Sequence, residues 1–350
     1  MGVRMSISTW RTRIRSALAV TLLAVVPLVF QAGAAPAGAG ERASSTSVVY
    51  DSFSKPGGYT IDDYAAKWSN PYGPGEMALG DTRSFAGSRF NVSAAPFRTA
   101  YDFSVFDHLK YIGISTQAFR VPTDGAIEIS STIKASTPGT QPGRVVHGTY
   151  LATGAPYAQP TLEGQQAGAV MNVVDFATGQ LFDWFVSGGT AFALIERLPS
   201  SVTGNTSDTS SPDYVGREKM YTQIIREVPV TPGIAHRVSI RFARNAAGSS
   251  VDYFLDGALV AHVDRVGVPL DVQGQPYTGT YPSLGPGEEL GQKINHLVIG
   301  HGLFSLLDAF PFQHPEAPEL SVSIPVSERA FGQGAIASFD DFKVKTTTNK

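Results

Sequence analysis

The chain has 350 residues, no cysteine and a formal net charge of −3 at pH 7. Disulfide bridges and thiol chemistry are therefore excluded, and the chain is long enough to bury a core without such bridges. Its only dense group of basic residues lies at the N-terminus, so the charge gives no support to a nucleic-acid or anionic-membrane partner.

The first 39 residues have the pattern of an export signal. Basic residues are followed by an apolar run, Ala17–Phe30, and then by two small-residue cleavage motifs ending at Ala34 and Ala39. The apolar run is shorter than the roughly 20 residues that a membrane-spanning helix needs. We expect residues 1–39 to be a signal peptide and the chain to be secreted and extracellular, without an anchor. Its arginine-rich, cysteine-free composition favours a bacterial origin.

Residues 40–47 are predicted to be a polar linker, and residues 48–346 a single domain. The region 55–96 is rich in Gly, Pro, Asn and Asp, which favours irregular structure with short edge strands. No long stretch has the 3.6-residue apolar period of an amphipathic helix. We expect at most a turn or two of helix at 62–67 or 103–110.

Beyond Gly125, apolar and polar residues alternate in many short segments, as they do in half-buried strands. The predicted strands cover 125–134, three segments within 170–198, 220–230, 236–244, 251–255, 259–263, 294–299 and 338–344. The segments between them, 135–168, 199–219 and 265–292, are predicted to be long loops. Short strands with turn signals and no repeat predict an all-β protein, a single-domain antiparallel β-sandwich.

The segment 170–198 is predicted to form two successive hairpins. Two-residue loops at Thr178-Gly179 and Gly188-Gly189 would join the strands, because glycine supplies the positive φ that such loops need. The first loop places Phe176 opposite Leu181.

The second loop places Asp183 opposite Leu194. Because side chains alternate between faces, Asp183, Glu196 and Asn172 then share one face, and Trp184 lies on the other. Asp183 and Glu196 become diagonal neighbours, roughly 7–8 Å apart.

Three segments, taken in order, resemble the concanavalin A-like lectin/glucanase jelly roll. Residues 125–134 are similar to the strand that opens the cleft sheet of laminarinase-type enzymes. Residues 236–242 and 251–260 resemble the back-sheet strand and the Asp-Gly hairpin that are common in this superfamily. Residues 338–344 are similar to the final strand of the jelly roll, which pairs near the N-terminal strand. The chain also looks like an uncharacterised secreted actinobacterial family. The resemblance implies a jelly-roll sandwich with long loops and a glycan as partner.

The resemblance does not extend to a catalytic motif. Family 16 glycoside hydrolases carry Glu-x-Asp-x-(x)-Glu on one cleft strand, and neither 171–176 nor 181–186 has that spacing. No catalytic residue can therefore be carried over from that family.

Asp183 and Glu196 are the candidate catalytic residues, either as an acid/base pair or as groups that bind sugar hydroxyls. Their diagonal spacing lies nearer the ~6.5–9.5 Å of inverting glycosidases than the ~5–5.5 Å of retaining ones. A structural role, with Glu196 paired to an arginine or to solvent, would explain the same pattern. Candidate ligand contacts are Trp184, Trp68, Asn172 and Tyr221. Trp184 fits core packing as well as sugar stacking, and Trp68 is a candidate for an exposed platform.

No metal site is predicted. The spacing of His296, His301 and Asp308 matches no zinc motif. The superfamily often holds a structural calcium ion, and Asp62-Asp63 and Asp340-Asp341 are the acidic pairs that could contribute to one. We expect no other cofactor.

Three hypotheses of function follow. The leading one is a monomeric, secreted glycan-binding protein. The second is a glycoside hydrolase or polysaccharide lyase with a non-standard carboxylate pair, and the third a structural or interaction protein of the cell envelope. An enzyme needs the carboxyls in an open groove, a lectin needs exposed aromatic rings, and a structural protein needs a sheet face sealed by loops.

Overall fold

A computed structural model describes residues 43–70, 81–99, 106–278, 282–308 and 317–349. The chain divides into two units, residues 1–40 and 41–350, and the described residues all belong to the second. The predicted signal peptide, residues 1–39, lies outside them.

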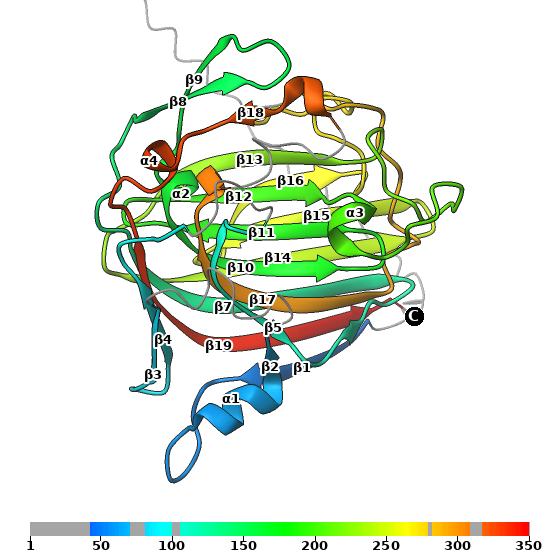
Figure 1. Ribbon diagram of the computed structural model, residues 1–350. Coiled ribbons are helices and arrows are strands. Elements are labelled where there is room, and N and C mark those ends of the chain that lie inside the picture. The colour runs from blue at the N-terminus through cyan, green and yellow to red at the C-terminus, as the bar shows by residue number, and fades with distance from the viewer. Residues whose placement is uncertain (1–42, 71–80, 100–105, 279–281, 309–316, 350) are drawn as a thin grey trace, which may run out of the picture. The chain divides into compact units, whose positions relative to one another are not determined.

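Two large antiparallel sheets form a β-sandwich (Figure 1). The back sheet has the order β16 (Ala258–Asp264), β15 (Gly248–Leu255), β14 (Ala235–Asn245), β7 (Gly125–Ser136), β19 (Ala335–Thr348), β4 (Phe90–Ala94) and β3 (Thr82–Phe85), and β1 (Ser44–Asp51) pairs with β19. The front sheet has the order β13 (Tyr221–Pro229), β12 (Thr190–Arg197), β11 (Gln180–Val186), β10 (Gly168–Asp175), β17 (His296–Phe304), β5 (Leu109–Ser115) and β2 (Trp68–Ser69), and β6 (Phe119–Arg120) pairs with β17. The predicted fold class is confirmed.

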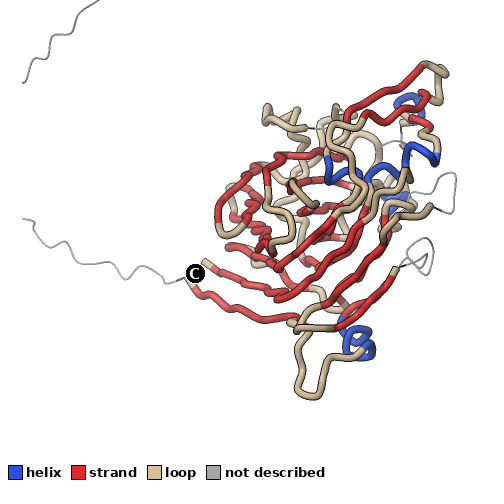
Figure 2. Tube along the Cα trace, turned by 90° about the vertical axis from the view of Figure 1, so that its left-hand side faces the viewer, coloured by secondary structure: helices blue, strands red, loops and turns tan. Residues whose placement is uncertain are grey.

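The remaining elements are short and lie outside the two sheets (Figure 2). They are the small sheet β18 (Val322–Ser323), β8 (Val145–Tyr150) and β9 (Pro156–Pro160), the helices α1 (Ile61–Lys67), α2 (Glu163–Gln166), α3 (Ser200–Thr203) and α4 (Val326–Arg329), and the 3-10 turns η2 (Leu306–Asp308) and η3 (Pro318–Leu320). None of the helices among the described residues has the length and hydropathy that a membrane span needs.

The core lies between the inner faces of the two sheets. The alternating isoleucines of β7 point into it, as the sequence predicts. Two hydrogen bonds also cross it: Trp184 Nε1 donates to the Ser239 carbonyl at 3.1 Å, and the Tyr253 hydroxyl donates to the Leu194 carbonyl at 2.8 Å. These bonds satisfy the polar ends of two fully buried aromatic side chains.

Several boundaries differ from the predictions. The predicted loop 135–168 contains β8, β9 and α2. The predicted linker 40–47 overlaps β1, which begins at Ser44, and β19 continues to Thr348. These segments were missed because they are rich in Ser, Thr, Gly or Pro and have no apolar alternation. Helix α1 confirms the predicted turns at 62–67. At 103–110, residues 103–105 lie outside the described part, and β5 begins at Leu109.

The second central hairpin has the predicted register, and the first does not. Asp183 lies opposite Leu194, and Ser187 donates its N–H to the Thr190 carbonyl around the two-residue loop. In the first hairpin Leu181 lies opposite Val174 instead of Phe176, so a four-residue loop joins β10 to β11.

Candidate functional site

The candidate site lies on the outer face of the front sheet, the face turned away from the back sheet. The strands β10, β11 and β12 place mostly apolar side chains on it, and these form a second hydrophobic cluster. Its central members are Val170, Phe185, Phe192, Leu194 and Phe304. The polar exceptions are Asn172, Asp183 and Glu196, so the three candidates share one face as predicted.

Asn172 and Asp183 are direct neighbours on β10 and β11. Both side chains are 2% exposed, and Asn172 Nδ2 donates to Asp183 Oδ1 at 2.8 Å. Asn172 Oδ1 is buried as well and has no hydrogen-bond partner among the described residues. One strand further on, Glu196 lies opposite Leu181 and therefore diagonal to Asp183, and its Oε2 accepts a hydrogen bond from Thr222 Oγ1 at 2.9 Å.

Burial raises the pKa of both carboxyl groups. For Glu196 the pKa rises to about 7, although the hydrogen bond from Thr222 opposes the shift. For Asp183 burial is the largest cause, repulsion by Glu196 adds to it, and the pKa lies well above the usual value. Both carboxyls therefore favour the protonated form more than free carboxyls do, as interacting carboxyls in an apolar setting do.

A cavity of about 60 Å³ opens beside these groups, and we call it the Glu196 cavity. Asn172 and Glu196 are two of its polar lining residues. Most of the others are apolar, among them Val174, Phe176, Leu181, Phe304 and Leu306. A buried water needs only about 10–15 Å³ of such space, so the cavity has room for a small chemical group.

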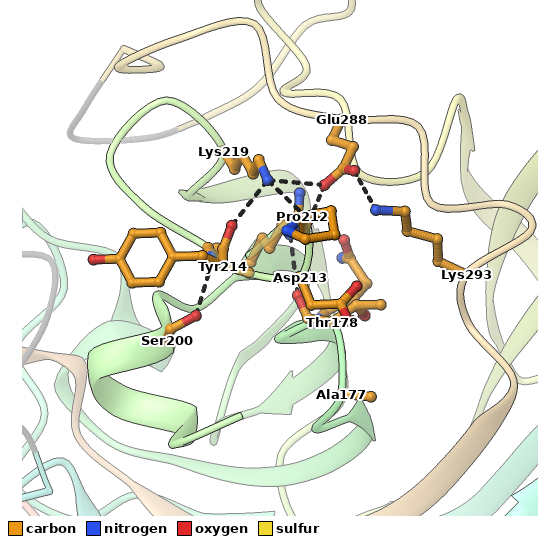
Figure 3. A network of polar contacts seen from close by, with 12 residues as sticks. Ala177, Thr178, Ser200, Pro212, Asp213, Tyr214, Lys219, Glu288 and Lys293 are labelled. Atoms are coloured by element: carbon orange, nitrogen blue, oxygen red, sulfur yellow. Dashed lines mark hydrogen bonds and ion pairs between the residues drawn. The ribbon is translucent and has the colours of Figure 1, made fainter. Parts of the chain in front are cut away.

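The loop that follows β12 supplies one wall of the cavity, through Leu198 and through Val202 of α3. Polar contacts hold this loop in place (Figure 3). Lys219 Nζ donates to the Tyr214 carbonyl at 2.8 Å and lies 3.7 Å from Glu288 Oε2, and the Ser200 hydroxyl accepts from the Val215 N–H at 2.8 Å. The wall is therefore built by defined contacts within the loop and with Glu288.

Glycine in β17 makes room for Asn172, a signal that the sequence prediction did not use. Gly300 lies opposite Asn172, and a Cβ atom added there would come within 3.0 Å of Asn172 Oδ1 and 3.1 Å of an Ile114 side-chain carbon. Glycine inside a strand often marks such a close approach. The pattern Gly300-His301-Gly302 could have pointed to this strand.

The structure does not bring the other predicted ligand contacts to the site. Trp184 is fully buried between the sheets and packs in the core, which is the alternative to sugar stacking that the sequence also allowed. Trp68 is 2% exposed and its Nε1 donates to Asp51 Oδ2 at 2.8 Å, so it is no exposed platform. Tyr221 is 4% exposed, faces the core and donates to Gln180 Oε1 at 3.0 Å. Of the four, only Asn172 lines the cavity.

The histidines and acidic pairs considered for metal binding do not gather at one point. His301 is in the core, while His296 is exposed on β17. Asp63 caps α1 and pairs with Lys55, and Asp341 pairs with Lys343. Within the described ranges, no group of three or more His, Asp or Glu side chains has the arrangement of a metal site.

Solved structures of similar fold include proteins whose names refer to glycans. The endo-1,3-β-glucanase of Streptomyces sioyaensis is 10% identical, with a TM-score of 0.39 over 91% of this chain and 100% of that one. The β-agarase B of Zobellia galactanivorans is 11% identical, with a TM-score of 0.40 over 90% and 97%. The alginate lyase A1-II′ is 10% identical, with a TM-score of 0.37 over 86% and 93%. At such identities the likeness concerns the fold alone.

Comparison of the sequence itself gives the family. No curated protein matches the chain. Residues 61–348 match the family described as a family of unknown function (DUF6081), and this range covers most of the sandwich, from α1 to the end of β19. The chain belongs to this family, DUF6081.

Proposed function

We propose that this protein recognises a glycan at the outer face of the front sheet, with the Glu196 cavity as the point of contact. One observation carries the proposal: Asn172 Oδ1 is a buried acceptor for which the described residues supply no donor, and it lies with the Glu196 carboxyl in a mostly apolar cavity. A buried acceptor without a donor costs about 1–3 kcal/mol. A ligand hydroxyl or amide N–H would supply the donor.

The size of the cavity limits what enters it. With a volume of about 60 Å³ it would take one substituent of the sugar, such as a hydroxymethyl or acetyl group, and the ring would lie at the entrance. The apolar wall would then pack against the C–H groups of that substituent. Phe106, which also lines the cavity and is 38% exposed, offers an apolar surface to the ring at the entrance.

The test is a pull-down on a panel of insoluble polysaccharides together with a reducing-sugar assay. The wild-type protein should bind at least one polysaccharide without releasing sugar, and Glu196→Gln should weaken this binding at least tenfold. Glu227→Gln is the matched control, because Glu227 lies on the adjacent strand β13 and does not line the cavity. Absence of binding across the panel would contradict the proposal and favour the interaction protein of the cell envelope.

Hydrolysis or elimination by Asp183 and Glu196 is the second candidate, and the raised pKa values favour it. A carboxyl with a pKa near 7 can act as a general acid at neutral pH. Sugar release that disappears in the Asp183→Asn/Glu196→Gln double variant would establish this activity. Binding that persists with no release in the wild-type protein would exclude it for that polysaccharide.

We also propose that the protein acts outside the cell. The support is the N-terminal pattern of basic, apolar and small residues in positions 1–39.

A further inference from the structure

A second, larger pocket lies where β6 meets β17, at the end of the sandwich. It has a volume of about 550 Å³ and shares no lining residue with the Glu196 cavity. Its lining includes four basic side chains and one acidic side chain. The basic ones are Arg120, Arg244, Lys293 and His296, and the acidic one is Asp175.

Arg244 brings a buried positive charge to the wall of this pocket. Its side chain is 4% exposed, and its hydrogen bonds go to four backbone carbonyl oxygens, those of Val121, Pro122, Gly291 and Ile294, at 2.6 to 3.2 Å. These carbonyl groups satisfy the guanidinium N–H groups but do not neutralise the positive charge of Arg244. Burial lowers the pKa of Arg244, which reflects the cost of holding this charge away from water.

Arg120 and His296 form the rim of the pocket. They are direct cross-strand partners on β6 and β17, so their side chains leave the sheet on the same face. Both residues are exposed. Two basic groups opposite one another repel when both are charged, and an anion held between them would remove this repulsion.

The two nearby acidic groups differ in their partners: Asp175 accepts hydrogen bonds from neutral groups and keeps its charge, while Glu288 is paired with a lysine. Asp175 Oδ2 accepts from Thr178 Oγ1 at 2.8 Å, and its Oδ1 accepts from the Ala177 N–H at 3.3 Å. Glu288 Oε1 lies 2.5 Å from Lys293 Nζ, a pair drawn in Figure 3, so Lys293 contributes little free charge. The local positive charge therefore comes from Arg120 and Arg244, His296 adds a ring that can donate a hydrogen bond, and Asp175 is the acidic side chain in the lining.

We propose that this pocket binds an anionic group, a carboxylate, sulfate or phosphate, between Arg120 and His296 with Arg244 behind it. The whole protein carries a formal charge of −3, so any attraction for anions comes from this local arrangement. The amide of Asn295, which also lines the pocket, can add a neutral donor. The site is independent of glycan binding at the Glu196 cavity.

The test is isothermal titration of the full chain with sodium sulfate, sodium phosphate and sodium glucuronate, at an ionic strength kept constant with sodium chloride. At least one of the three anions should bind saturably at one site, and uncharged glucose should not. The anion that binds most tightly distinguishes a sulfated, phosphorylated or carboxylated ligand. Weak heats that do not saturate for any of the three would overturn the proposal.

Matched variants separate a site from general attraction. Arg120→Gln/His296→Gln should lower the affinity at least tenfold, while Arg120→Lys, which keeps the charge, should retain most of it. Arg89→Gln removes one positive charge from the turn between β3 and β4 in the back sheet and should have no effect on the affinity. Both rim residues are exposed, so the variants should unfold at the wild-type temperature. Equal affinity in all variants would contradict the assignment of the site.

Discussion

His301 shows how a polar side chain is accommodated in the core of this sandwich. It is fully buried on β17 and lies edge-on to Trp68, with ring centroids 4.5 Å apart, and near Phe90 and Phe339. Its Nε2 lies 2.9 Å from the Tyr64 hydroxyl. Burial lowers the pKa of His301 to about 3, so the ring is neutral at physiological pH. The same aromatic group encloses Trp68 and explains why that side chain is not a surface platform.

The first prediction concerns Tyr64. Its hydroxyl lies 2.5 Å from the Tyr111 hydroxyl and 2.9 Å from His301 Nε2, so it links the two side chains. Tyr64→Phe leaves two buried polar groups with one partner fewer, and should lower the free energy of unfolding by about 1–3 kcal/mol. Urea unfolding measures this loss. Tyr214→Phe is the control, because the hydrogen bonds of Tyr214 run through its main chain. Equal stability of the two variants would show that the Tyr64 hydroxyl contributes nothing.

The second prediction concerns the pH dependence of stability through Glu196. Its pKa is about 7 in the folded protein against 4.5 for the free group, so the folded state favours the protonated form. This contribution is complete below pH 4.5 and is lost as the pH rises through 7. Glu196→Gln cannot ionise and should avoid a loss on the order of 2 kcal/mol between pH 5 and pH 8.

Urea unfolding of wild type and Glu196→Gln at pH 5 and pH 8 checks this prediction. Relative to the wild type, the free energy of unfolding of the variant should be higher at pH 8 than at pH 5. Part of the pH dependence should remain because Asp183 is still present. The same difference between the two proteins at both pH values would mean that the Glu196 carboxyl is solvated in the folded state.

At the scale of elements, the first central hairpin shows which part of the site the sequence could predict. Leu181 was predicted opposite Phe176 and lies opposite Val174, a shift of two positions. Because side chains alternate with a period of two, an even shift leaves every residue on its predicted face. The common face of Asn172, Asp183 and Glu196 was therefore correct although the register was not.

The surroundings of that face could not be predicted in the same way. Alternation places Trp184 on the face opposite Asp183, but it does not say which of the two faces packs against the other sheet and which carries a cavity. The burial of Trp68 depends on contacts with β17 and β19, which are more than 200 positions away in the chain. Such contacts leave no local pattern in the sequence. The small sheet β18-β8-β9 was missed for another reason: its edge strand β9 begins and ends with a proline, Pro156 and Pro160, and proline argues against a strand.

The third prediction concerns a buried group of charges that joins β5, η2 and α4. Asp308 lies 2.6 Å from Lys110 Nζ and 2.9 Å from Arg329 Nη1, and all three side chains are at most 4% exposed. Asp308→Asn leaves Lys110 with a neutral partner and Arg329 with the more distant Asp107 carboxylate at 3.9 Å, and should cost about 3–5 kcal/mol. Urea unfolding measures the cost.

Asp264→Asn is the control for this variant, because Asp264 pairs with His262 but its side chain is 65% exposed. Its effect should stay below about 1 kcal/mol. Since η2 also carries Leu306 of the Glu196 cavity, Asp308→Asn should weaken the proposed glycan binding as well. A stable Asp308→Asn protein would show that the two cations reach water.

At the scale of the whole molecule, the first and last described strands lie side by side. β1 pairs with β19 from Ser44 opposite Thr348 to Asp51 opposite Phe342, as the resemblance of the last strand predicts. Asp51 is 1% exposed and accepts hydrogen bonds from Trp68 Nε1 at 2.8 Å and from the Tyr59 hydroxyl at 2.6 Å. The start of the sandwich is thus tied into its core.

The fourth prediction uses this arrangement to separate the proposed signal peptide from the domain. Cleavage after Ala39 would leave four residues before β1, so a chain that starts at Gly40 should have the urea midpoint of the full chain. A chain that starts at Phe53 lacks β1 and the Asp51 carboxylate, and should unfold at a clearly lower urea concentration. If the Gly40 chain were also destabilised, residues 1–39 would contribute to the fold. N-terminal sequencing of the exported protein would then be expected to find those residues still attached, contrary to a signal peptide.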